Sequence, residues 1–311
     1  MAWKRTGMFL LKLSGSLALL AYVASHIDWP HVSVLLAQVN PLYIVLNVLL
    51  IALSTTLMSM RWYEICQYFC IEVSRTFTLK NMWISTFFNQ VLPGGVGGDA
   101  VRVLALKDHL RTGGISSVLI DRGIGMLMIF INVLVLLPIS YLLLGHTAIF
   151  PLFPLLGMTG VSIGLGFVLW GDKLPLHHIP HLGRWLKSIP AAVRHVLLYP
   201  SPRQWRVVGL SLAIQALGIA HFYVAALALG LNPSLWACAA LVPPVYLLVI
   251  IPLSLAGWGL REGAVVSLFT LAGQMNATEA ATMSVLYGLC MVATSLPGAV
   301  VLVMSKTKKT A

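Results

Sequence analysis

The chain has 311 residues, of which 59 % are hydrophobic and only 9 % are charged, and its mean hydropathy is +0.90. Soluble domains carry close to a quarter charged residues, so this composition excludes a soluble protein. The net charge of +11 would suit a nucleic-acid-binding protein. Its basic residues, however, are spread between apolar runs and form no single face. Membrane orientation and anionic lipid account for the charge better, and we expect no nucleic-acid partner.

Apolar runs of about 18 to 25 residues are long enough for helices to cross roughly 30 Å of hydrocarbon. They predict an all-α polytopic membrane protein, a single integral membrane domain over residues 1–311. We expect about six full transmembrane helices, at 8–25, 42–60, 115–144, 148–170, 207–230 and 283–304. The first run follows Lys4, Arg5 and Lys12 as a secretory signal would. Because more spans follow, we expect an uncleaved anchor.

Two further apolar segments, 77–92 and 235–251, run into Pro93 and Pro252 and then into glycine-rich, charged sequence. If both are re-entrant, 18 of the 20 Lys and Arg residues fall on one side of the membrane. The loops near 26–41, 145–147, 231–234 and 274–282 then contain none. If 77–92 crossed fully, the basic loop 171–206 would lie outside. The positive-inside rule therefore favours re-entrant segments, with both termini cytoplasmic in a bacterial inner membrane.

This arrangement predicts an inverted-topology repeat. The first half, 42–144, and the second half, 207–304, each read as span, broken segment, span, with opposite orientations and a basic cytoplasmic linker between them. A short echo supports it, because Pro93-Gly-Gly-Val-Gly-Gly-Asp has a counterpart in the sequence 252–262. Transporters use such repeats to bring discontinuous helices together near the midplane of the bilayer.

The first broken segment has the residues of an anion site. Its glycines permit a non-helical backbone and the close approach of another group: Gly94, Gly95, Gly97 and Gly98. A helix that restarts near Asp99 would point amide donors into a cavity, and Arg102, one turn on, could hold a phosphate or pair with Asp99. The alternative is that Asp99 is only an N-cap and Arg102 only a cytoplasmic anchor.

Two adjacent pairs of opposite charge lie within apolar sequence. Asp121 and Arg122 fall about two turns into the third span, where each charge costs roughly 2.5 to 3.5 kcal/mol at the bilayer centre. They are either a cavity pair or a snorkelling pair near the interface. Arg261 and Glu262 face the same choice in the second broken segment. There we favour a functional role, because the loops on that side carry no other Lys or Arg.

Other candidate sites are weaker. The segment 184–206, within the predicted cytoplasmic linker 171–206, reads as a basic interfacial element on anionic lipid headgroups. We expect no metal at the loop histidines and no cofactor, and we expect the cysteines to be reduced and structural because none has a CxxC spacing: His177, His178, His181, Cys66, Cys70, Cys238 and Cys290. No catalytic motif is recognisable, so we expect a protein that is not an enzyme.

At the two broken segments the sequence resembles the lysylphosphatidylglycerol synthase transmembrane family, also described as flippase-like. The residues that carry the resemblance are Asn89, Pro93, Gly94, Gly95, Gly97, Gly98, Asp99, Arg102, Asp121, Arg122, Gly257, Gly259, Arg261 and Glu262. The family is named after bifunctional proteins whose membrane half moves an aminoacylated phospholipid between leaflets while a cytosolic half synthesises it. This chain ends at Lys306-Thr-Lys-Lys-Thr-Ala. We therefore expect a stand-alone membrane domain without lysyl transfer.

The function expected is that of a lipid transporter. A phosphate-containing lipid or glycolipid headgroup would cross a polar cavity between the two broken elements, held in turn by Arg102, Arg122 and Arg261. The neighbouring carboxylates Asp99, Asp121 and Glu262 would orient these arginines and could pair with a cationic part of the headgroup. A carboxylate could also carry protons for coupled transport. Two alternatives remain: an accessory protein that supports a lipid- or polysaccharide-modifying enzyme, and an intramembrane lipid-carrier transferase.

Overall fold

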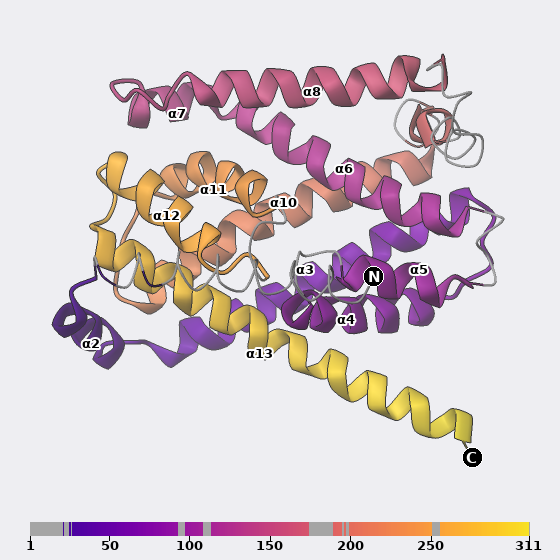
Figure 1. Cartoon of the computed structure of the whole chain (residues 1–311), viewed down its shortest axis with the longest axis horizontal. Coiled ribbons are helices and arrows are strands. Elements are labelled where there is room, and N and C mark those ends of the chain that lie inside the picture. The colour runs from indigo at the N-terminus through magenta and orange to yellow at the C-terminus, as the bar shows by residue number, and fades with distance from the viewer. Residues whose placement is uncertain are drawn as a thin grey trace, which may run out of the picture.

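The computed structural model describes residues 21, 25, 27–92, 97–107, 113–173, 189–194, 196, 199–250 and 256–310, with side chains as far as 305. All regular elements within these residues are helices. The longest of them run broadly along the long axis of the molecule (Figure 1). The predicted all-α fold class is therefore confirmed.

Five helices are long and apolar enough to cross a membrane: Pro41–Tyr68, Gly114–Val135, Leu152–Lys173, Pro202–Ala228 and Ala277–Ser305. Each corresponds to one of the six predicted spans. The remaining span, 8–25, lies outside the described residues except at 21 and 25. The number of full crossings and the re-entrant repeat therefore stay predictions.

The first described helices are set by their N-caps. α2 (Trp29–Ala37) lies in a stretch for which no helix was predicted, and the Asp28 amide donates to Thr278 Oγ1 at 3.1 Å, which ties α2 to the start of α13. α3 (Pro41–Tyr68) begins with Pro41 after Asn40, whose side chain accepts from the Leu42 amide. α4 (Arg75–Val91) is capped in the same way by Ser74.

α5 (Gly97–Ala105) and α6 (Gly114–Val135) follow. The prediction of one continuous helix over 115–144 is wrong, because α6 ends at Val135 and α7 (Leu137–Leu144) begins anew with Pro138 in its first turn. Proline lacks an amide hydrogen and its ring clashes with the carbonyl four residues earlier, so a helix breaks ahead of it. α8 (Leu152–Trp170) and the short η2 (Gly171–Lys173) complete this part.

The second half contains α10 (Pro202–Ala228), α11 (Leu235–Ile250), α12 (Leu260–Leu271) and α13 (Ala277–Thr310). α13 begins before the predicted residue 283 because Asn276 and Glu279 cap each other, each side chain accepting from the other's amide at 2.9 Å. α11 carries Pro243 and Pro244 in its interior.

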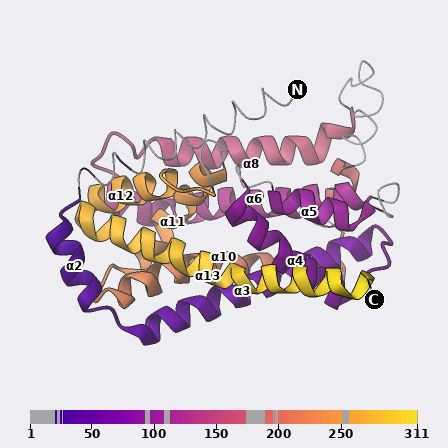
Figure 2. The same ribbon diagram turned by 60° about the horizontal axis from the view of Figure 1, so that its bottom comes forward.

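The contacts that the helices of 41–135 make are matched by contacts of the helices of 202–310. α3 packs against α10; α4 contacts α5 and α13, and correspondingly α11 contacts α12 and α6. Likewise, the contact between α3 and α13 corresponds to the contact between α10 and α6. Figures 1 and 2 both show α4 beside α13. The largest hydrophobic core cluster lies where α10 to α13 meet α3, around Phe222, Leu241, Phe269 and Met283.

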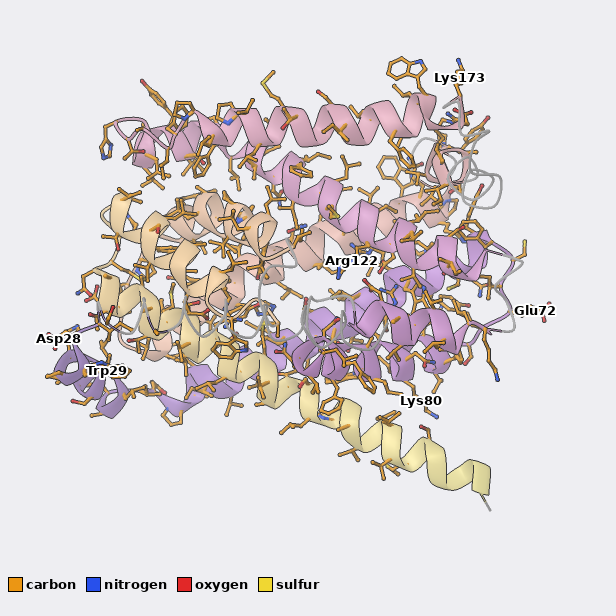
Figure 3. The ribbon with its side chains drawn as sticks, in the orientation of Figure 1. Asp28, Trp29, Glu72, Lys80, Arg122 and Lys173 are labelled. Atoms are coloured by element: carbon orange, nitrogen blue, oxygen red, sulfur yellow. The ribbon has the colours of Figure 1, made fainter. Side chains whose placement is uncertain are left out.

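Charged loops gather at one end of the molecule. Figure 3 shows Glu72, Lys80 and Lys173 at that end and Asp28 with Trp29 at the opposite one, while Arg122 lies between the two. The charge pattern of the sequence predicts that these two groups of residues lie on opposite sides of the membrane. Arg122 is thus placed away from both ends, as its position within an apolar run indicates.

Candidate functional site

The first break in the apolar sequence brings α5 back against α4. The Gly98 amide donates to Asn89 Oδ1 at 2.9 Å, so a side chain of α4 accepts a hydrogen bond from the first turn of α5. A Cβ on Gly98 would overlap the Ser85 carbonyl oxygen, which explains why only glycine fits there, and a Cβ on Gly97 would overlap the Leu92 side chain. Gly94 and Gly95 lie outside the described residues.

Five charged side chains from α3, α5 and α6 form one series of alternating sign. Asp121 Oδ1 accepts from Arg61 Nε at 2.7 Å, and Asp121 Oδ2 accepts from Arg102 Nη2 at 2.8 Å. Arg102 Nη1 lies 3.5 Å from Asp99 Oδ1, and Arg122 Nε lies 2.7 Å from Asp99 Oδ2. The order is Arg61, Asp121, Arg102, Asp99, Arg122, with a guanidinium at each end. We call these residues the arginine–aspartate row.

The row runs from a fully buried end to a partly open one. Arg61, Arg102 and Asp121 are each at most 4 % exposed, whereas the Asp99 side chain is 19 % and the Arg122 side chain 36 % exposed. Neighbouring groups hold the buried end in place. Arg61 Nη1 donates to Ser211 Oγ at 3.3 Å, and the Arg102 guanidinium stacks on the Trp62 ring, 4.3 Å from its centroid.

A cavity of about 230 Å³ opens on the row. All five charged residues line it, together with Asn89, Ser85 and Thr86 of α4. Its apolar lining comes from Met58, Met82, Gly125, Met126, Ile129 and Ile250. The structure therefore brings together Asn89, Asp99, Arg102, Asp121 and Arg122, which the sequence had placed in two separate motifs, and gives them a common space.

A model of the family described as the lysylphosphatidylglycerol synthase TM region matches residues 9–298. The chain belongs to this family. The match spans both broken segments and all five candidate spans but for the last few residues, so the resemblance carried by the motif residues is confirmed and the chain is a multi-pass membrane protein.

The chain is also similar to a protein of Methanothermobacter thermautotrophicus that is described as a UPF0104 membrane protein. The two are 25 % identical over 270 residues, which cover 75 % of each chain. No solved structure matches the chain.

The second break holds a closed ion pair. Arg261 Nη2 donates to Glu262 Oε1 at 2.6 Å, and Glu262 Oε2 accepts from the Gly259 amide at 2.7 Å, which caps α12. Gly257 and Gly259 have φ of 84° and 87°, values that favour glycine. The Arg261–Glu262 pair is almost fully buried.

Neighbours on all sides fill the space around Arg261. Its Nε lies 3.3 Å from Ser284 Oγ, and its guanidinium lies over the rings of Trp258 and Tyr287, at 4.7 and 5.4 Å from their centroids. A Cβ on Gly288 would overlap Arg261 Nη2, so α13 also leaves room for this side chain only by having glycine there.

The second cluster does not line the cavity of the first. Arg261 and Glu262 are not among the described residues around the 230 Å³ cavity, although Ile250, the last residue of α11, is. The stretch 251–255 that connects Ile250 to the second cluster lies outside the described residues, and Pro252 with it. A shared pathway between the two breaks therefore stays a prediction.

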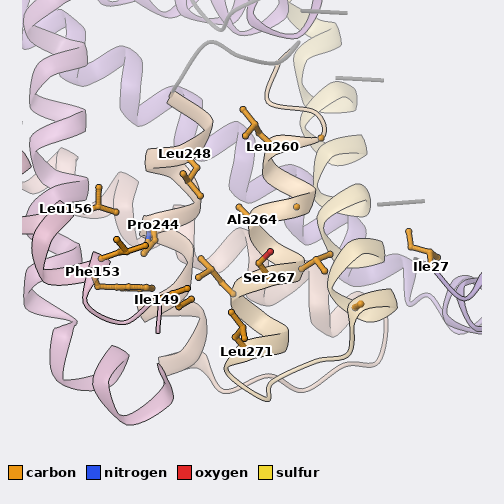
Figure 4. A pocket seen from close by; sticks show the side chains of 16 residues that line it. Ile27, Ile149, Phe153, Leu156, Pro244, Leu248, Leu260, Ala264, Ser267 and Leu271 are labelled. Carbon is orange, nitrogen blue, oxygen red and sulfur yellow. The ribbon is translucent and has the colours of Figure 1, made fainter. Parts of the chain in front are cut away.

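A larger groove of about 640 Å³ lies between α8, α11 and α12 (Figure 4). Its walls are almost entirely apolar, with Phe153, Leu156, Pro244, Leu248 and Leu271 among them. Gly259 and Gly263 bring the groove alongside the first turns of α12, whose other face carries the Arg261–Glu262 pair.

Sequence reasoning missed two members of the first site. Arg61 was placed with the cytoplasmic charges because the apolar run was ended at residue 60, and Ser211 was not considered. The signal was present: apolar residues continue past Arg61 at Trp62, Ile65 and Cys66, all fully buried. Such a continuation places Arg61 inside the helix and not in a loop.

Basic residues of the predicted interfacial element are paired where they are described. Arg194 Nη2 lies 2.6 Å from Asp172 Oδ2 and its Nη1 donates to two carbonyls at the end of α8. Arg203 and Arg206 both pair with the buried Glu64. Residues 184–188, His177, His178 and His181 lie outside the described residues. Binding of anionic headgroups at 184–206 stays a prediction.

Proposed function

We propose that this protein is a flippase-like lipid transporter that moves the phosphate-containing headgroup of a lipid or glycolipid through the cavity at the arginine–aspartate row. The single observation that carries the proposal is that cavity, in which three arginines, two aspartates and an asparagine of α3 to α6 face one space. Of these four helices, α3 and α6 are long and apolar enough to cross a membrane. Acyl or prenyl chains would stay in the bilayer while the headgroup passes.

The energetic argument starts from the cost of charge in a membrane. Each charged side chain near the bilayer centre costs roughly 2.5 to 3.5 kcal/mol, and backbone that is not helical is tolerated at that depth only inside protein or along a wet cavity. The row and the break before α5 both carry these costs. Transport of a polar cargo that needs such a surface would explain why the protein carries these costs.

Guanidinium groups suit a phosphate because they offer charge-assisted hydrogen bonds in a fork that matches phosphate oxygens. Arg122 and Arg102 would contact the headgroup, while Asp99 and Asp121 keep the guanidinium groups oriented. The family description names the membrane region of a lipid synthase, and this supports lipid as the cargo.

The inverted repeat would provide the movement. The matched contacts of α3 to α6 and α10 to α13 support two equivalent halves, each with one discontinuous element, α4–α5 and α11–α12. In the proposed orientation the protein lies in the cytoplasmic membrane with both termini inside. The Arg261–Glu262 pair would hold the second break closed on the opposite side, with Gly257 and Gly259 forming its turn.

The test is reconstitution of the purified protein into vesicles that contain labelled lipids of several headgroup types. We expect at least one phospholipid to cross faster than in empty vesicles, and Asp99→Asn to slow it because the two arginines lose their shared partner. Gly123→Ala is the matched control, since a Cβ there meets nothing within 4 Å. If no lipid crosses faster and Asp99→Asn changes nothing in cells, transport is ruled out.

Two other functions predict different outcomes in the same material. An accessory protein would co-purify with a lipid- or polysaccharide-modifying enzyme and would tolerate substitutions in the row. A lipid-carrier transferase would form product when the purified chain receives donor and acceptor lipids.

A further inference from the structure

Asp99 lies between two guanidinium groups at the edge of the first cavity. Its Oδ2 is 2.7 Å from Arg122 Nε, and its Oδ1 is 3.5 Å from Arg102 Nη1. Partial burial of the Asp99 side chain disfavours its ionised form, and the two guanidinium groups stabilise that form. The ionised carboxylate is therefore held against the cost of desolvation by the arginines that line the same cavity.

A phosphate in this cavity competes with Asp99 for these arginines. Asp99 and Arg122 form the partly open end of the row, with side chains 19 % and 36 % exposed, so a ligand reaches them before the buried end. A phosphate that takes over their contacts removes the partners of the carboxylate and places a second negative charge beside it. Both changes disfavour the ionised form. Asp99 thus gains affinity for a proton when the anion binds.

The other carboxylates are poorly placed for this role. Asp121, the second acid in the described lining, is 1 % exposed and holds two arginines through its two oxygens. Glu262 is fully buried in its own ion pair and is not among the described lining residues. Protonating either one breaks a closed buried pair. A proton reaches Asp99 without disturbing the buried end of the row.

The elements around α5 determine which charges act on Asp99. These charges are, in decreasing order, those of Arg122, Arg102 and Asp121. Arg61 of α3 also faces the cavity, and arginine keeps its proton throughout the physiological range. The described lining from α4 contains no group that titrates there: Met82, Ser85, Thr86 and Asn89. Asp99 is thus the titratable group of the described lining that an anion bound at the open end affects most directly.

An anion and a proton together leave the charge of the cavity unchanged. A phosphodiester brings one negative charge, and a proton on Asp99 brings one positive charge. Whatever the charges around the cavity sum to, binding both does not alter that sum. Because added charge is costly inside a membrane protein, binding of the pair is favoured over binding of the anion alone.

We propose that Asp99 is a proton-binding site and that one proton binds there with each anionic headgroup, so that proton and headgroup cross the membrane in the same direction. This inference rests on the proposed function, since it adds an energy source to transport through the same cavity. It assigns one carboxylate and one proton per headgroup. By linkage, the proton and the headgroup each raise the affinity for the other by the same factor.

Proton uptake on binding tests the coupling without transport. Dihexanoyl-phosphatidylglycerol serves as the probe, because a phosphodiester lacks the second ionisation that phosphomonoesters have near pH 6. It is titrated calorimetrically into the full-length protein in mild detergent, in two buffers of different ionisation enthalpy. We expect uptake of about one proton per bound probe, and an affinity that rises by up to about tenfold for each pH unit lowered. Binding without proton uptake at every pH from about 5 to about 8 overturns the proposal.

Three variants assign the proton to Asp99. Asp99→Asn keeps this side chain uncharged, and we expect it to bind the probe at every pH as tightly as the wild type does at low pH, without proton uptake. Asp99→Glu keeps a titratable carboxylate and should keep the uptake. Asp172→Asn is the matched control, because it removes a carboxylate that pairs with Arg194 outside the described lining, and it should also keep the uptake. Unchanged uptake in a folded Asp99→Asn protein overturns the assignment.

Vesicles with a pH gradient separate the coupling from transport itself. In phosphatidylcholine vesicles that contain the protein, we expect labelled phosphatidylglycerol to gather in the leaflet on the alkaline side, and Asp99→Asn to remove this bias. If the lipid crosses but its distribution ignores the gradient, transport stands and the coupling fails. If the probe binds with proton uptake and no lipid crosses, the proposed function fails and the proton site stands.

Discussion

The two breaks of this chain handle buried charge in opposite ways. At the first, five charged groups from three helices alternate in sign and end on a partly exposed arginine beside a cavity. At the second, Arg261 and Glu262 are adjacent in sequence and pair with each other. Two aromatic rings and Ser284 surround Arg261, and α13 makes room for it with a glycine at 288.

Two similar sequence motifs can therefore have different roles in one chain. A series of charged groups that reaches a cavity is suited to receive a ligand, whereas a closed ion pair is suited to fix the backbone of a short helix. Substitutions that remove one charge or add one methyl group separate a binding cluster from a structural one.

Asp121→Asn should be the most destabilising single change, because Arg61 and Arg102 both lose their buried partner. Leaving a buried charge uncompensated costs about 3 to 5 kcal/mol. Denaturant titration in mild detergent measures the free energy of unfolding. Asp172→Asn, which removes an ion pair at the rim of α8, serves as the control and should change it little. Wild-type stability in Asp121→Asn would mean that the row is not assembled as described.

The Arg261–Glu262 pair should behave as a unit. Either Arg261→Met or Glu262→Gln alone leaves one buried partner unsatisfied and should cost about 3 kcal/mol, while the double variant should lie closer to the wild type than either single. A double-mutant cycle on unfolding free energies measures the coupling.

Lipid binding then distinguishes the two clusters. We expect the Arg261→Met/Glu262→Gln protein to bind dihexanoyl-phosphatidylglycerol as the wild type does, and an Arg61→Met/Asp121→Asn protein to lose that binding. If instead the first double variant loses binding while still folded, the second break belongs to the binding surface.

Gly98→Ala tests the return of α5 onto α4. The new Cβ would overlap the Ser85 carbonyl, which is backbone and cannot rotate away, so overpacking should cost about 1 to 3 kcal/mol. Gly123→Ala on α6 has open space and should be neutral or stabilise by about 0.5 to 1 kcal/mol. Equal effects of the two changes on unfolding would show that the close approach at Gly98 is unimportant.

We expect the smallest change in unfolding free energy at Glu64, in the last part of α3. Glu64 pairs with Arg203 and Arg206, whose side chains are 43 % and 53 % exposed, so Glu64→Gln should cost at most about 1 kcal/mol. Thermal unfolding at low and high salt checks this, since added salt should reduce the difference. A larger loss of stability that added salt does not reduce would show that these charges are shielded from solvent.

Much of the fold was predictable, because apolar length and the turn chemistry at 92–97 and after 250 act locally. Five spans and both breaks followed from those signals. Pro138 was visible in the sequence, yet a proline can either kink a span or end it, and only packing decides between the two.

Part of the site could not be predicted from the sequence, for a physical reason. Asp99 and Arg102 were found together because they lie one turn apart, but the bridge from Arg61 to Asp121 joins residues 60 positions apart. Nothing in local sequence specifies that contact. The position of the buried end of the row depends on it.

The proposed function requires that the headgroup binds at the arginine–aspartate row. Photo-crosslinking tests this most directly, with a phosphatidylglycerol that carries a diazirine in its glycerol, followed by peptide mapping of the labelled full-length protein. The structure predicts labels on the cavity lining, within 82–89, 99–102 and 122–129. Labels confined to 258–262 or to 200–206, with none on those three stretches, would contradict it.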